Sequence, residues 1–511
     1  MPLSAFLKKR IWDEKLRNPL GAGMLLLFAL GFAWLVSTYG LVLGLLLIAA
    51  LVGIPTVYGI VAYPKLGIVI LLVAAFSLFF ILRLGLDFPV GTLMDGMEWL
   101  LILGTVLAGR KKIQPGQSVF KNPVAVMILI WVVYTVLQVV NPWAESQMAW
   151  LYTVRNVGAV TLMYFVFVSQ IDSVPYLRGL IWLWLGLALV GALYGFKQEF
   201  IGFSPDEFQQ MLSDPKTVEL LFIDGHWRKY SIFSDPVAFA YNMVMAALIC
   251  VCLLQVKKGF FKKLLLLVIA GACIASMLFA GTRGAYVLIP AGFGMFFLLR
   301  FSRTIVVLAG VAAIGFGVLI TIPTSNPTLY RFQTAFRPAD DPSFNLRTYN
   351  QKLIQPYIQQ NPIGGGLGAT GVWGQRFAPD SYLANFPPDS GYVRVAVEMG
   401  WLGLLLFCCL IFIILKTGID HFFMLRNAEL KAYCLAMTIV VFVLGIGSYP
   451  QEAFVQFPSN ILFYLAAAII QVSLQLDAPV EEPEPPVDER SRLNRANAGA
   501  AIARNSSSTV L

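Results

Sequence analysis

The residues of this chain that could do chemistry are arginines in three polar segments between apolar stretches. In the first segment, His226 and Arg228 lie among aromatic residues, a pattern that suits an anionic head group with a sugar attached and equally an aromatic belt with basic anchors at the membrane interface. In the second, Arg283 lies between glycines in a predicted tight turn, where its guanidinium and nearby backbone N–H groups can meet an oxyanion. The third is a long polar segment, residues 323–390, which contains Arg347. Its aromatics and turn residues favour an ordered segment that covers an active site.

Acidic residues that could accept a proton lie at the end of the third segment and just after it. Asp389 comes directly before an apolar helix that we expect to begin near residue 391, and helix N-capping is an alternative role for it. Arg394 and Glu398 are four residues apart on that helix, so they can pair on one face. The candidates for a general base are Asp389, His226 and Glu398, and we favour Asp389.

The composition places these residues in a membrane protein. The chain has 511 residues, of which 58% are hydrophobic and 13% charged, with a mean hydropathy of +0.74. Apolar windows of spanning length predict an all-α polytopic membrane protein with about 12–14 transmembrane helices. The windows lie at residues 21–36, 41–62, 66–82, 93–108, 123–140, 150–169, 177–196, 236–255, 264–281, 285–299, 304–321, 391–415, 431–447 and 458–475.

The distribution of lysine and arginine predicts the orientation. Basic residues are concentrated in alternate short turns, which the positive-inside rule assigns to the cytoplasm, so both termini are expected there. The net charge of +9 is therefore a topology signal, and no nucleic-acid partner is expected because the basic residues form no single patch. The predicted organisation is a cytoplasmic leader (1–19), a transmembrane bundle (20–196), a first periplasmic loop (197–235), further transmembrane helices (236–322), a large periplasmic loop (323–390), the last transmembrane helices (391–476) and a disordered cytoplasmic tail (477–511).

Charged residues within the predicted helices lie near their outer ends. This favours a polar cavity that opens outward, although snorkelling to the interface explains any single residue as well. In the first outer loop, Ser204 followed by Pro205, Asp206 and Glu207 predicts the start of a short helix. The charged residues at the outer helix ends are Asp95, Glu98, Arg155, Lys197, Glu199, Arg283, Arg394 and Glu398.

Taken in order, the outer motifs resemble the O-antigen ligase and O-antigen polymerase superfamily of bacterial envelope proteins. The resemblance extends over roughly residues 225–415 and rests on the order, spacing and shared outer location of individually loose motifs. These are Arg228 before Ser231–Pro236, then Thr282–Ala285, Asn345–Arg347, the glycine-rich Asn361–Gly368, Asp389–Tyr392 and Glu398–Gly403.

The resemblance implies a metal-independent glycosyltransferase at the periplasmic face of the bacterial inner membrane, without a cofactor. Its donor would be an undecaprenyl-diphosphate-linked glycan, and its acceptor a hydroxyl of lipid A core, of another lipid-linked repeat or of a protein. Membrane lipids and polysaccharide assembly proteins are the other implied partners. In ligases of the family, arginines matching Arg228 and Arg347 are functional, as is a histidine whose place Asp389 takes here. This departure favours a polymerase-like or divergent role over a ligase.

For such a reaction we expect arginines to hold the diphosphate, since a diphosphate leaving group needs fixed positive charge. Arg228, Arg283 and Arg347 are expected to meet there, with His226 and Arg394 as further substrate ligands. Asp389 is expected to assist the acceptor, with Arg347 and Glu398 as the other catalytic candidates. The alternatives from other classes are a transporter or flippase of lipid-linked glycans, and a non-catalytic scaffold of a polysaccharide assembly complex.

Overall fold

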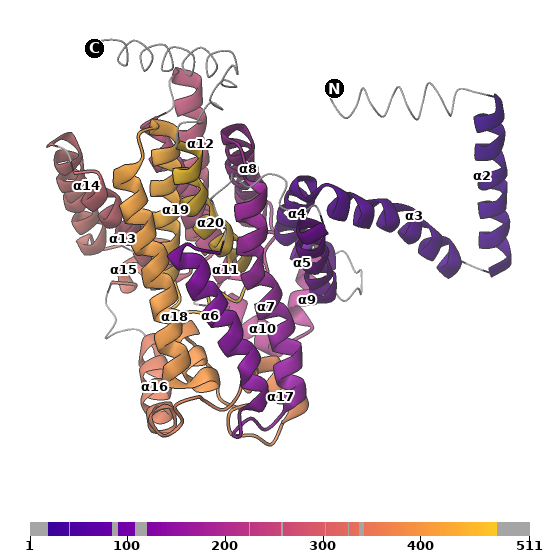
Figure 1. The fold of residues 1–511 in the computed structure, drawn as a ribbon. Helices are drawn as coiled ribbons and strands as arrows, with labels where there is room; N and C mark the ends of the chain where they lie inside the picture. Colours follow the sequence, from indigo (N-terminus) through magenta and orange to yellow (C-terminus); the bar gives the residue numbers. More distant parts are fainter. Residues whose placement is uncertain are drawn as a thin grey trace, which may run out of the picture.

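The computed structural model describes residues 19–477 except residues 40, 84–89, 108–119, 224, 257–258, 302, 325–326 and 337–341. Within these ranges the chain is almost entirely helical (Figure 1). The strands of the described part are β1 (Phe222–Ile223) and β2 (His226–Trp227), which pair antiparallel. The helices are α2 (Pro19–Tyr39), α3 (Leu41–Ala62), α4 (Pro64–Leu82), α5 (Val90–Leu107), α6 (Pro123–Leu137), η2 (Gln138–Val140), α7 (Gln147–Gln170), α8 (Val174–Phe200), α9 (Pro205–Leu212), α10 (Pro215–Leu221), α11 (Pro236–Leu254), α12 (Phe260–Phe279), α13 (Arg283–Leu299), α14 (Arg303–Thr321), α15 (Pro327–Thr334), α16 (Pro342–Gln360), α17 (Gly371–Phe377), α18 (Gly391–Met424), α19 (Ala428–Gly447) and α20 (Ser459–Asp477).

The prediction of an all-α polytopic membrane protein is confirmed. Among the described residues, nine helices are long and apolar enough to cross a membrane: α4, α6 with η2, α7, α8, α11, α12, α18, α19 and α20. Each apolar window predicted from the sequence falls on a helix. The total number of spans, their orientation and the loop boundaries remain predictions. The predicted leader and most of the predicted tail lie outside the described residues.

The centre of the bundle is formed by α11, α19 and α20, whose apolar windows are 89%, 83% and 78% buried. Polar side chains tie these helices together: the hydroxyl of Tyr241 donates to the carbonyl of Gly447 at 3.0 Å, and the side-chain amide of Asn242 lies 3.2 Å from the hydroxyl oxygen of Ser459. Buried hydrogen bonds of this kind fix how neighbouring helices of a membrane bundle pack.

The polar segment 323–390 is ordered where it is described, and it contains α15, α16 and α17. Helices α16 and α17 lie at one end of the bundle, the end at which α13 begins and α19 ends (Figure 1). The short helix expected after Ser204 is confirmed as α9, where Ser204 and Glu207 form a complete capping box.

Candidate functional site

Arg283 and Arg347 line one cavity of about 660 Å³. Arg283 is the first residue of α13, and Arg347 lies on α16 in the outer segment. Most of the remaining wall is apolar and comes from α13, α18 and α19, so the cavity joins a charged end to an apolar interior. We call it the arginine cavity; its other lining residues are Gly284, Val287, Leu288, Ala335, Phe344, Thr348, Gln351, Tyr392, Ile411, Leu415, Phe442, Gly445, Ile446, Tyr449 and Pro450.

The start of α13 contributes charge beyond the side chain of Arg283. Arg283 and Gly284, the first two residues of the helix, both line the cavity, so the partial positive charge of the helix N-terminus lies at the same wall. The start of α13 packs closely against its neighbours, because a Cβ atom on Gly284 would lie 3.0 Å from the hydroxyl oxygen of Tyr241 and 3.3 Å from a ring carbon of Pro450. This end of the cavity suits an anion.

Arg228 does not line the arginine cavity, contrary to the expectation that three arginines share one surface. It is only 8% exposed, and its guanidinium donates to the carbonyls of Ala280 (2.9 Å) and Leu220 (3.1 Å). Its Nη2 atom also donates to the hydroxyl of Thr282 at 3.0 Å. The donors of Arg228 are therefore used inside the protein, where they hold the turn that leads into Arg283.

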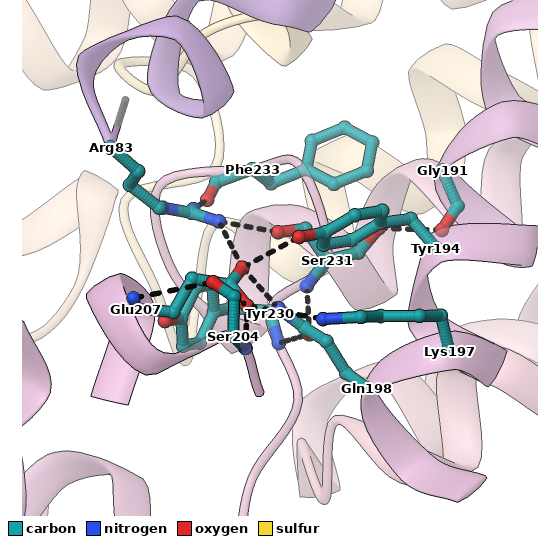
Figure 2. Close-up of polar contacts among 10 residues, drawn as sticks. All are labelled: Arg83, Gly191, Tyr194, Lys197, Gln198, Ser204, Glu207, Tyr230, Ser231 and Phe233. Carbon is teal, nitrogen blue, oxygen red and sulfur yellow. Dashed lines mark hydrogen bonds and ion pairs between the residues drawn. The ribbon is translucent and has the colours of Figure 1, made fainter. Parts of the chain in front are cut away.

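A buried cluster around Glu207 holds the segment that carries Arg228 (Figure 2). The carboxylate of Glu207 accepts hydrogen bonds from Tyr194 and Gln198 at 3.0 Å each, and the amine of Lys197 lies 3.6 Å away. Gln198 in turn accepts the backbone N–H of Ser231 at 2.8 Å. Burial by itself would raise the pKa of Glu207, but hydrogen bonds from Ser204, Tyr194 and Gln198 and the charge of Lys197 lower the pKa overall.

Arg83, directly after α4, completes this Glu207 cluster. Its guanidinium donates to the backbone carbonyls of Ser231 and Phe233 and lies 3.8 Å from the carboxylate of Glu207. The loop between α8 and α11 is thereby fixed to α4 and α8 as well as to the turn before Arg283. We infer that the loop is a rigid support for one wall of the arginine cavity.

Asp389 lies next to the arginine cavity rather than in its wall. The side-chain amide of Asn350 donates to the Asp389 carboxylate at 3.2 Å, and Asn350 follows Arg347 by three residues on α16. Asp389 is exposed, so water and an incoming hydroxyl can reach it. The alternative role of Asp389 as a helix cap is wrong, because the N-cap residue of α18 is its neighbour Ser390, which has an extended backbone conformation.

Glu398 organises the glycine-rich turn. The side chain is 3% exposed, and its carboxylate accepts hydrogen bonds from the backbone N–H of Gly368 and from the backbone and hydroxyl of Thr370. The backbone carbonyl of Glu398 also accepts the N–H of Gly366 at 2.9 Å. Two residues later, Gly400 has a φ of 71° and interrupts the helix. With these hydrogen bonds in place, Glu398 acts as a positioning residue for the turn.

The expected pair of Arg394 and Glu398 is confirmed, with 3.1 Å between Nε and Oε1. Arg394 also pairs with Glu452 at 2.6 Å, a partner that the sequence motifs did not indicate. Burial raises the pKa of the Glu452 carboxyl above its ordinary value, and the charge of Arg394 opposes this shift. Glu452 lies a few residues after the predicted apolar window 431–447. An acidic residue just outside a predicted span was the signal in the sequence that could have indicated it as a partner for Arg394.

Arg394 and Glu398 line a second cavity, of about 260 Å³, and not the arginine cavity. His226 lines neither; it lies on β2 with its side chain 56% exposed and Nε2 3.7 Å from the Glu199 carboxylate. Among the residues that the structure describes, no three His, Cys, Asp or Glu side chains form a group that could hold a metal ion. Of the predicted site residues, the structure thus brings together Arg283, Arg347 and, beside them, Asp389.

Comparison with known families agrees with the motifs. The family model described as O-antigen ligase matches residues 265–408, a stretch that contains α13, α16, the glycine-rich turn and the start of α18. The resemblance to the O-antigen ligase and polymerase superfamily is thereby confirmed. A match of this kind implies ligase-type or polymerase-type glycosyl transfer, with a lipid-linked glycan and an acceptor as substrates in general terms. No curated protein matches the chain.

Proposed function

We propose that the protein transfers a glycan from polyprenyl diphosphate to an acceptor hydroxyl at the periplasmic face of the inner membrane. The observation that carries this proposal is the arginine cavity, in which Arg283 and Arg347 meet at one end of an otherwise largely apolar space. Undecaprenyl diphosphate has the same two parts, a dianionic head and a long apolar chain. Bidentate binding by arginine suits the head group, and the apolar walls suit the chain.

In the proposed reaction, residues of the arginine cavity stabilise the leaving group, and Asp389 beside the cavity is the base. The acceptor hydroxyl attacks the anomeric carbon of the glycan, the bond from that carbon to the phosphate oxygen breaks, and the diphosphate leaves with the electron pair. Arg283, Arg347 and the N-terminus of α13 stabilise the charge that develops on it. Asp389, held by Asn350, takes the proton of the hydroxyl.

The roles assigned to the other residues change with this geometry. Arg228 supports the turn before Arg283 through Thr282, and Glu398 supports the glycine-rich turn. The acceptor class, lipid A core or another lipid-linked repeat, defines whether the protein is a ligase or a polymerase in the synthesis of lipopolysaccharide or another surface polysaccharide. The replacement of the family histidine by Asp389 supports a polymerase-like or divergent acceptor.

The proposal is tested with a deletion strain complemented by wild type, Arg347→Ala or Lys352→Ala, with protein levels compared. Lys352 is an exposed cation on the same helix that does not line the arginine cavity, so it is the matched control. We expect Lys352→Ala to restore long polysaccharide and Arg347→Ala to fail. Accumulated polyprenyl-linked polymer would identify a ligase, and accumulated single repeats a polymerase. Full restoration by Arg347→Ala would contradict the proposal and favour transport or scaffolding.

A further inference from the structure

The second cavity, of about 260 Å³, lies between α5, α7, α17 and a face of α18 that differs from the one in the arginine cavity. Its wall combines aromatic rings with two arginines and two carboxylates, those of Asp95 and Glu398, whereas the described wall of the arginine cavity has two arginines and no carboxylate. The residues that matter for its chemistry are Asp95, Tyr152, Arg155, Asn156, Trp373 and Arg394. None of them is required to bind diphosphate in the function proposed above.

An aromatic platform forms one side of this cavity. The ring centroids of Tyr152 and Trp373 are 4.7 Å apart, and Phe377 lies 5.1 Å from Tyr152. The guanidinium of Arg376, which is also on α17, lies over the ring of Trp373 at 5.9 Å from its centroid. Tyr152 and Trp373 both line the cavity, and both side chains are only half-buried.

A fixed set of hydrogen-bonding groups forms another side. Asp95 is 3% exposed, pairs with Arg155 at 2.7 Å and accepts a hydrogen bond from the Asn156 amide at 3.0 Å. The carboxylate of Asp95 is buried while the side chain of Arg155 is 37% exposed, so Asp95 fixes a guanidinium that stays partly exposed in the wall of the cavity. Together the three side chains offer both acceptors and donors at fixed positions.

We propose that the second cavity binds a sugar ring of the glycan substrate. The C–H face of a pyranose is apolar and carries a small positive partial charge, which suits the face of an aromatic ring. Its hydroxyl groups donate and accept, which suits a carboxylate beside a guanidinium and an amide. A phosphate is disfavoured here because both arginines of the cavity, Arg155 and Arg394, are already paired with carboxylates. A prenyl chain is disfavoured because it offers no hydrogen bonds to these polar groups.

The second cavity lies close to Asp389, the proposed base. The assignment of a sugar to this cavity rests on the proposed function. Gly391 lines the second cavity and follows Asp389 by two residues, while Asn350 ties Asp389 to the helix of Arg347. Since Gly391 lines the second cavity and Tyr392 lines the arginine cavity, both cavities border the start of α18, directly after Asp389. The ring can belong to the acceptor or to the donor glycan, because the recognition chemistry is the same for both.

The test measures binding of two soluble probes to the full-length protein in lipid nanodiscs. One probe is the glycan that mild acid releases from the polyprenyl-linked donor of the producing cells, and the other is the core oligosaccharide that mild acid releases from their lipid A. We expect at least one probe to bind wild type, and Trp373→Ala to weaken that binding about tenfold or more, which is the contribution of a stacked ring. Binding of the core oligosaccharide identifies the ring as part of a lipid A core acceptor, and binding of the donor glycan identifies it as part of a lipid-linked repeat.

Three variants make the test specific. Trp373→Phe keeps an aromatic face and is expected to bind within about threefold of wild type, since most of the stacking free energy remains. Val372→Ala, at the exposed neighbouring position on α17, is the matched control for folding of that helix. Arg347→Ala is expected to bind both probes normally, because neither carries a diphosphate. Binding of neither probe to wild type, or equal binding by Trp373→Ala and wild type, overturns the sugar site. Failure of the transfer reaction itself is scored separately, by the polysaccharide profile of Arg347→Ala.

Discussion

The Nη2 atom of Arg228 donates to the hydroxyl of Thr282 at 3.0 Å, and Thr282 is the residue directly before Arg283. The sequence predicted Arg228 to be a substrate ligand. In the structure it instead holds the turn that positions Arg283. The same guanidinium also holds the carbonyl of Ala280, so both sides of the turn depend on it.

This relationship predicts that Thr282→Val impairs transfer through Arg283. Valine has nearly the same shape but no hydroxyl, so the Arg228 donor loses its partner and the turn can shift. We expect a loss of donor affinity on the order of tenfold or more, since small displacements of binding groups are costly. The measurement is the KM for the lipid-linked donor, compared with kcat and with the thermal unfolding midpoint.

Thr282→Ser provides the control because it retains the hydroxyl, and it should restore the donor KM. If Thr282→Val unfolds at the wild-type temperature and also keeps the wild-type KM, Arg228 does not position Arg283.

A second prediction concerns the glycine-rich turn. Gly364 has a φ of 74°, and a Cβ atom there would lie 2.4 Å from the backbone nitrogen of Gly400. Gly364→Ala therefore forces the turn away from the break in α18, and we expect a strong loss of folded protein by size-exclusion chromatography in detergent. Gly294→Ala, on α13, is the matched control and should behave as wild type, because a Cβ atom added there would meet no atom within 4 Å. Equal yields of the two variants would contradict the close docking of turn and helix.

A third prediction is the pH dependence of the Glu207 cluster. The pKa of Glu207 is lowered in the folded protein, so folding favours its deprotonated form. Its contribution to stability is then fully present above the unfolded-state pKa of about 4.3 and is lost as the pH falls through the lower folded-state pKa. We expect the difference in unfolding midpoint between wild type and Glu207→Gln to be constant near neutral pH and to shrink below about pH 4.3. A difference that grows on acidification would show that the sign of the shift is wrong.

A fourth prediction concerns Arg394, whose guanidinium pairs with both Glu398 and Glu452. Arg394→Ala leaves two largely buried carboxylates without their cation, and we expect destabilisation of about 3–5 kcal/mol. Glu452→Gln should cost less, because Arg394 keeps Glu398 as its partner. Thermal unfolding in detergent ranks the two variants, and a smaller effect of Arg394→Ala would count against the role of this residue as the shared cation.

The sequence was informative where one physical effect dominates. Spanning helices need long apolar runs, so every predicted window falls on a helix, and the capping pattern at Ser204 predicted α9. The helices of the outer segment were not predicted. Helix α16 is polar on average and contains Pro356, so its apolar periodicity is weak, and packing against α18 determines its position.

The candidate site was predictable only in part, for a related reason. The types of Arg283 and Arg347 indicated an anion site, and their meeting in one cavity depends on how α13 and α16 pack. Nothing in the sequence distinguishes Arg228 from them, because the acceptors that occupy its guanidinium come from distant segments. Glu452 and the aromatic pair of Tyr152 and Trp373 acquire their roles in the same way, through tertiary contacts.

The most direct test of the account is a double-mutant cycle on binding of undecaprenyl diphosphate to the purified protein. Wild type, Arg283→Ala, Arg347→Ala and the double variant are compared, with Lys352→Ala as the control. We predict that each single variant weakens binding and that the losses are not additive, because both guanidinium groups act on one diphosphate. Binding by Arg283→Ala and Arg347→Ala that equals that of Lys352→Ala would contradict the arginine cavity as the diphosphate site.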